Sequence, residues 1–172
     1  MLKIVGAFLV FAGALGIGNS ISKRLKQHYH QLIALKELLL LMGNEMRYLK
    51  TPLPQALKRI AGQCEAPFGE VLIQTADELL KYLEASPGKV WKKVLQSNRS
   101  DYLLSEEEYQ IFIEAGNILE QSNTYMQKEE VALFTEQVQF KLVHAQEELR
   151  TKQRISRYLC GAGGLFLILL LL

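Results

Sequence analysis

The stretch 21–49 carries the feature that most constrains the fold, a single apolar stripe at helical spacing. Its members recur in steps of three and four, interrupted only by His28: Leu25, Leu32, Leu35, Leu39, Met42, Met46 and Leu49. We call this stripe the Leu25–Leu49 seam. Such a seam needs a facing helix, and a second long run, 125–157, repeats apolar residues at the same spacing. The pattern predicts two long helices packed on each other.

Each long run continues into an apolar end of the chain, residues 4–17 before the first and 159–172 after the second. About 14 apolar residues rise only about 21 Å as a helix, against about 30 Å of hydrocarbon in a bilayer. Even so, we predict an N-terminal transmembrane helix at 1–18 and a C-terminal one at 158–172. Two spans rooted in one membrane make the long helices antiparallel, with a helical domain at 19–157 between them.

The basic residues predict which side of the membrane holds this domain. They flank both apolar segments on the domain's side: Lys23, Arg24, Lys26, Arg150, Lys152, Arg154 and Arg157. By the positive-inside rule, we expect a cell-membrane protein whose soluble domain is cytoplasmic. A rival interpretation of the N-terminus is a cleaved signal peptide, since Lys3 and the apolar run precede Ala12-Gly13-Ala14. The two basic flanks favour a retained span, and cleavage stays open.

Capping and turn residues divide the chain between the long runs into shorter helices. Thr51 as N-cap and Pro52 as first helical residue predict a sharp turn and a helix to about residue 63. A third helix is predicted over 68–84, with an inward stripe that includes Leu83. Ser86 and Pro87 cap a fourth, with core residues at Val90, Trp91, Val94 and Leu95.

The segment 97–104 is the most loop-like part of the chain, and we expect it to be the most mobile. Ser105 and Glu108 form a capping box for a fifth helix that is expected to bury Tyr109, Phe112, Ile113 and Leu119. Gly116 inside that helix indicates that another helix crosses closely. Because no alternating strand pattern is present, the sequence predicts an all-α bundle of about six helices.

Catalytic, metal and cofactor sites find no support in the sequence. Cys64 and Cys160 lack the paired spacing of zinc ligands, and His28 and His30 point to different helix faces. There is no glycine-rich phosphate loop and no nucleophile motif. A net charge of +2 without a wide basic field argues against nucleic acid. We predict a non-enzymatic protein without catalytic residues, metal or cofactor, which acts through its helix surfaces.

The segment 45–53 carries a resemblance to a known family. Its Glu-x-x-Tyr-x-x-Thr-Pro-Leu sequence, followed by Ala56 and set between two apolar chain ends, resembles stage III sporulation protein AB of endospore-forming bacteria. The resemblance covers the whole chain. The chain departs from it at Ala115, Glu120 and Asn123, where phenylalanine, glycine and aspartate are expected.

The resemblance implies a component of the channel complex between mother cell and forespore, located in the mother-cell membrane. It implies a helical domain similar to the inner-membrane platform proteins of type II secretion and type IV pilus machines. The implied partners are other sporulation channel proteins, including a secretion-type ATPase, and a homo-oligomer is possible. We therefore expect a platform that links the ATPase to the channel.

The turn after the first long helix is the expected contact surface for this partner: Glu45, Arg47, Tyr48, Thr51, Pro52 and Leu53. Thr51 and Pro52 are equally explained as a helix cap, and Tyr48 as a packed side chain. An alternative from another class is a membrane-anchored coiled-coil scaffold or sensor that dimerises through the Leu25–Leu49 seam and has no motor partner.

Overall fold

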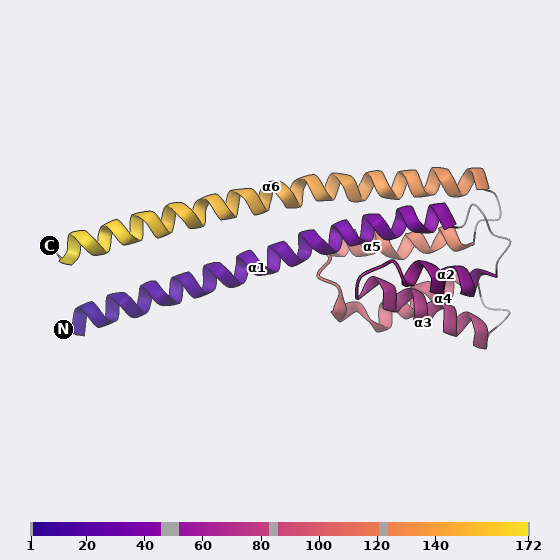
Figure 1. Ribbon diagram of the computed structural model, residues 1–172, viewed down its shortest axis with the longest axis horizontal. Coiled ribbons are helices and arrows are strands. Elements are labelled where there is room, and N and C mark those ends of the chain that lie inside the picture. Colours follow the sequence, from indigo (N-terminus) through magenta and orange to yellow (C-terminus); the bar gives the residue numbers. More distant parts are fainter. Residues whose placement is uncertain (1, 46–51, 83–85, 121–123, 172) are drawn as a thin grey trace. The chain divides into compact units, whose positions relative to one another are not determined.

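The computed structural model describes residues 2–45, 52–82, 86–120 and 124–171, with the side chains of 2–19, 21, 124–125, 153 and 156–171 left out. These residues form six α-helices and two short 3₁₀ helices, and they include no strand (Figure 1). The elements are α1 (Leu2–Glu45), α2 (Leu53–Ala61), α3 (Phe68–Lys81), α4 (Pro87–Ser97), η2 (Arg99–Asp101), α5 (Glu106–Glu114), η3 (Ala115–Leu119) and α6 (Thr124–Leu171). The predicted all-α class is confirmed.

The chain divides into two compact units. Unit 1 is Met1–Tyr29 with Val143–Leu172, and unit 2 is His30–Leu142. In unit 1, Ala145 is buried, and Lys152 pairs with Glu148 one turn earlier, with 2.7 Å between Nζ and Oε1. The side chains of the predicted spans at 1–18 and 158–172 lie outside the described residues. Within the described part of the chain, no helix is long and apolar enough to cross a membrane.

The described seam residues that belong to unit 2 are all buried. Four seam side chains have no exposed surface: Leu32, Leu35, Leu39 and Met42. Met46 and Leu49 lie outside the described residues. Lys36 donates to the side-chain oxygen of Gln139 at 2.8 Å, while Gly43 lies against Val131. The later residue of α1, Gly43, contacts an earlier residue of α6 than Lys36 does. The two helices are therefore antiparallel, as predicted.

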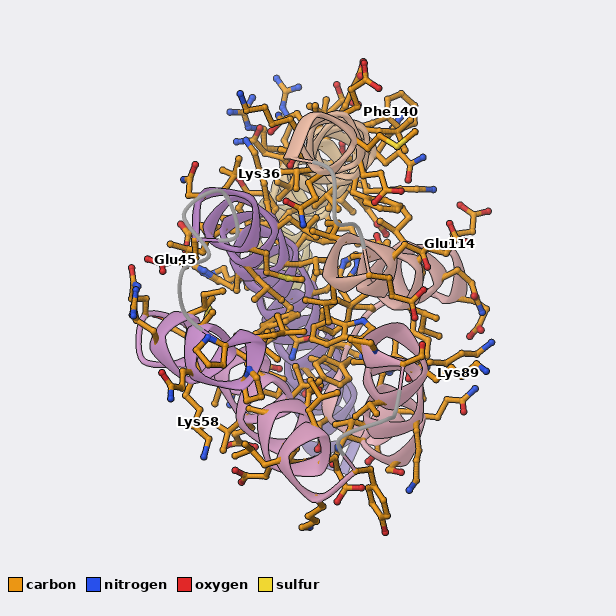
Figure 2. The ribbon with its side chains drawn as sticks, turned by 90° about the vertical axis from the view of Figure 1, so that its right-hand side faces the viewer. Lys36, Glu45, Lys58, Lys89, Glu114 and Phe140 are labelled. Carbon is orange, nitrogen blue, oxygen red and sulfur yellow. The ribbon has the colours of Figure 1, made fainter. Side chains whose placement is uncertain are left out.

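The buried face of α1 is wider than the seam. Leu38, which the seam does not include, is also completely buried. A broad apolar face is typical of a helix in a globular core, whereas a strict seam is typical of a two-stranded coiled coil. Figure 2 shows the helices of unit 2 arranged around a common set of side chains.

Aromatic rings fill the centre of unit 2. The Phe112 ring lies 5.3 Å from the Trp91 ring, 5.4 Å from Phe68 and 5.4 Å from Tyr102, each edge-on. The Trp91 indole N–H donates to the Phe112 carbonyl at 2.9 Å, which satisfies a buried donor. The predicted core residues of the fourth helix, from Val90 to Leu95, are buried.

Several predicted boundaries and positions need correction. Pro52 is the N-cap of α2 rather than its first residue, because its ψ of 139° is extended, not helical. The third helix ends at Lys81, and Leu83 lies outside the described residues. Gly116 lies in η3 rather than inside α5, and its close neighbour is the side chain of Trp91. Ile113 is only half-buried.

Candidate functional site

One residue of the predicted contact turn, Glu45, forms an ion pair within the chain. Glu45, at the end of α1, accepts from Arg59 of α2 at 3.1 Å. Pro52 is exposed and Leu53 is half-buried. Arg47, Tyr48 and Thr51 lie outside the described residues. Three of the six predicted contact residues are therefore located in the structure, and the Glu45 carboxylate is already engaged within the chain.

The loop predicted to be most mobile is instead fastened by two side chains. The Arg99 guanidinium donates to the carbonyls of Tyr102 at 3.1 Å and Leu104 at 3.0 Å. It also lies 4.3 Å from the centre of the Tyr109 ring, a cation–π contact. Gln31 of α1 accepts from the Leu103 N–H at 2.6 Å. Because these contacts satisfy loop backbone groups, the segment is part of the packed unit.

The pKa values of two tyrosines, Tyr102 in this loop and Tyr109 in α5, are both raised. Burial raises the pKa of Tyr102 well above its usual range, with a further contribution from the Asp101 carboxylate. Burial also raises the pKa of Tyr109, opposed by the nearby Arg99 charge. Neither phenol is poised for acid–base chemistry at neutral pH.

Glu120 has a structural role that the sequence did not reveal. Its Oε1 accepts from the Gly88 N–H at 3.2 Å and from the Ser86 hydroxyl. These groups begin α4, where unpaired N–H donors and the helix dipole favour a carboxylate. Glu120, one of the three positions at which the chain departs from the expected family pattern, thus anchors η3 to α4. The contact spans 32 residues, so no local sequence signal could have indicated it.

A groove of about 540 Å³ lies between α5 and α6 in unit 2. Its lining is Glu107, Ile111, Leu133, Glu136, Gln137, Phe140 and Lys141. Leu133 is 52% exposed and Phe140 is 62% exposed. Lys141 pairs with Glu107 across the groove. We call this the α5–α6 groove, and nothing in the sequence pointed to it, because the apolar pattern of α6 indicates only the inward stripe.

A second groove, about 500 Å³, lies on the α1 side of α6. Leu40, which is 43% exposed, Val131 and Ala132 provide its apolar lining. Lys36 spans it to reach Gln139, and Figure 2 shows Lys36 between α1 and α6. Among the side chains that the structure describes, no three His, Cys, Asp or Glu residues gather as a metal site. The described surface offers helix faces and grooves.

Comparison with known proteins decides the family. A family model described as "Stage III sporulation protein AB (spore_III_AB)" matches residues 3–172. The chain belongs to this family. Family membership supports a role in sporulation.

A solved structure named "Stage III sporulation protein AB (SpoIIIAB)" is similar to this family member, with a TM-score of 0.66 and 22% sequence identity. The match covers 72% of this chain and 97% of the solved chain. At that identity the likeness shows a shared fold. No curated protein matches the chain significantly.

Proposed function

We propose that the protein is a non-enzymatic platform in the mother-cell membrane, which links a cytoplasmic secretion-type ATPase to the channel between mother cell and forespore. The observation that carries the proposal is the family match over residues 3–172. The helical fold shared with a solved SpoIIIAB chain is consistent with it.

The long, continuous helices explain how such a platform would work mechanically. α1 and α6 each run without a break from unit 2 into a predicted span, over Leu2–Glu45 and Thr124–Leu171. A continuous helix transmits position along its axis better than a flexible linker does. Two such helices, anchored in one bilayer, would pass force or position from a motor protein to the membrane.

The turn after α1 is the proposed ATPase contact, through Glu45, Arg47, Tyr48, Thr51, Pro52 and Leu53. The exposed Pro52 and half-buried Leu53 offer an apolar contact at the start of α2. The Glu45–Arg59 ion pair joins the end of α1 to α2, the helix that follows this turn.

A binding experiment tests both the partner and the surface. The full-length chain is immobilised in nanodiscs, and the secretion-type ATPase of the same sporulation complex is titrated by biolayer interferometry. We expect saturable binding that Leu53→Glu weakens at least about tenfold, because the change places a charge in an apolar contact. Ile73→Glu is the matched control, since Ile73 is an exposed apolar residue of α3.

Two outcomes would contradict the proposal. If the wild-type chain does not bind the ATPase, the platform function is wrong. If binding is robust but Leu53→Glu and Ile73→Glu behave alike, the turn after α1 is not the contact surface. The thermal unfolding of both variants is measured alongside, so that a folding defect is not mistaken for lost contact.

The described seam residues do not favour the alternative scaffold function. Leu32, Leu35 and Leu39 are fully buried within one chain. A second copy could reach them only after this packing opened, at a cost comparable to the stability of the domain.

A further inference from the structure

α6 carries a second apolar stripe besides the one that faces the core. Met126, Leu133 and Phe140 are spaced by seven residues, so they share one face of the helix. They are 53%, 52% and 62% exposed. The core-facing stripe of the same helix, which includes Val131 and Phe134, is buried. A helix that is apolar on a buried face and again on an outer face has more apolar surface than its own fold requires.

The outer stripe leads into the α5–α6 groove. Leu133 and Phe140 line the groove on the α6 side, and Ile111 lines it on the α5 side. Figure 2 shows Phe140 at the outer surface of α6. A stripe with heptad spacing beside a groove of about 540 Å³ matches the way a grooved surface receives the apolar anchors of an amphipathic helix.

The charges around the stripe define the partner. Glu107 and Glu136 lie on the groove, and the exposed Glu129 lies one helical turn from Met126 and from Leu133. The only cation lining the described groove, Lys141, pairs with Glu107. The rim is therefore net acidic, and it is complementary to a helix with basic flanks.

The same charges disfavour the other occupants of an apolar face. A second copy docking through this stripe would bring the Glu129 and Glu136 carboxylates of both copies together, which is repulsive. An anionic lipid surface would be repelled in the same way. We propose that the α5–α6 groove binds an amphipathic helix of a partner protein, with an apolar stripe flanked by lysine or arginine. This surface is additional to the turn after α1, and it does not depend on the ATPase link.

Two synthetic peptides test the recognition chemistry. One is an 18-residue helix with leucines at positions i, i+3, i+7 and flanking lysines; the other has the same leucines with flanking glutamates. Fluorescence anisotropy measures their binding to the full-length chain in neutral detergent, with the detergent alone as blank. We expect the Leu/Lys peptide to bind at least about tenfold more tightly than the Leu/Glu peptide, and its affinity to fall with salt.

Substitutions on the chain locate the site. Phe140→Ala is expected to lower the affinity for the Leu/Lys peptide at least about tenfold, as for an aromatic anchor in a pocket. Leu80→Ala, at a 54% exposed position on α3, is the control and is expected to leave the affinity unchanged. Glu136→Lys is expected to lower the affinity for the Leu/Lys peptide and to raise the affinity for the Leu/Glu peptide. This reversal is not expected from a folding defect.

Four results would overturn the proposal. The first is equal binding of the two peptides, and the second is binding that Phe140→Ala leaves intact. The third is dimerisation of the chain that Phe140→Ala abolishes in light scattering, which would assign the stripe to a second copy. The fourth is Phe140-dependent cosedimentation with phosphatidylglycerol vesicles, which would assign it to lipid.

Discussion

Gly116 and Gly62 differ in what a methyl group at each position would meet. A Cβ at Gly116 would lie 3.0 Å from Cγ and 3.3 Å from Cβ of Trp91, whose side chain is completely buried. The indole is also held by its hydrogen bond to the Phe112 carbonyl, so it has no room to retreat. We expect Gly116→Ala to lower the free energy of unfolding by about 1–3 kcal/mol, the usual cost of overpacking. Urea unfolding followed by tryptophan fluorescence measures this change.

Gly62 provides the matched control for that measurement. A Cβ there would meet only the Arg59 carbonyl oxygen at 3.5 Å, an ordinary contact, and its φ of −67° suits any residue. Gly62→Ala is expected to leave stability unchanged or to raise it by about 0.4–1 kcal/mol, through the entropy of the unfolded chain. Equal effects at the two glycines would contradict the packing assigned to Trp91.

The residues whose roles could be predicted from sequence are those with local partners. Ser105 and Glu108 form the predicted capping box, with the Ser105 N–H donating to Glu108 at 2.7 Å, because the two groups are three residues apart. Gln31 contacts the backbone of the loop about 70 residues away, and Glu120 contacts α4 across 32 residues. A polar side chain in a helical pattern gives no sign of such a partner, so both roles required the structure.

At the scale of elements, the part of α1 that lies in unit 2 behaves as a core helix rather than as half of a coiled coil. The seam residue Leu35 and the off-seam residue Leu38 both have no exposed surface. We expect Leu35→Asp to unfold unit 2, with a loss of at least about 3 kcal/mol from the cavity and the buried charge. Circular dichroism during thermal unfolding measures the loss, and light scattering measures the oligomeric state at the same concentration.

Leu40→Asp is the control on the same helix, since Leu40 is 43% exposed and the new carboxylate can remain in water. It is expected to change stability by less than about 1 kcal/mol. If Leu35→Asp instead converts a well-folded dimer into a well-folded monomer, then the Leu25–Leu49 seam joins two copies, and the scaffold function is correct.

The element boundaries show where sequence signals stop being sufficient. Ser86 and Pro87 predicted the start of α4 correctly, because the serine hydroxyl accepts from the Lys89 N–H. Pro52 was assigned one position too far into its helix. Proline fixes φ at a value compatible with both the first helical residue and the cap, and only ψ distinguishes the two. The type of each element was predictable, whereas the exact end residue was not.

At the scale of the whole molecule, periodicity predicted the class and two long helices that face each other, since one apolar stripe requires another to face it. The antiparallel direction was predicted from the two apolar chain ends. The partner surfaces were less predictable. Of the predicted contact residues, Arg47, Tyr48 and Thr51 lie outside the described residues, and Glu45 is paired with Arg59. The outer stripe of α6 was missed because Leu133 and Phe140 look like ordinary members of an apolar helix until their exposure is known.

The predicted topology can be tested with Cys64, a half-buried free thiol in unit 2. Burial, with the Glu37 carboxylate as a further cause, raises the pKa of Cys64 above that of an exposed thiol. Because the thiolate is the reactive form, labelling is slow at neutral pH, and its rate rises about tenfold per pH unit below the pKa. Glu37→Gln is expected to speed the reaction at fixed pH by removing the charge that opposes the thiolate.

The measurement uses the Cys160→Ser chain, a membrane-impermeant methanethiosulfonate reagent at about pH 8.5, and equal reaction times for sealed and opened cells. If the two predicted spans place unit 2 in the cytoplasm, Cys64 reacts only in opened cells, and a Cys64→Ser, Cys160→Ser chain reacts in neither. Labelling in opened cells shows how fast Cys64 reacts once the reagent can reach it. If sealed cells then give no signal, the membrane has kept the reagent away from a thiol that is able to react. Labelling from outside sealed cells would contradict the cytoplasmic location and, with it, the proposed contact with a cytoplasmic ATPase.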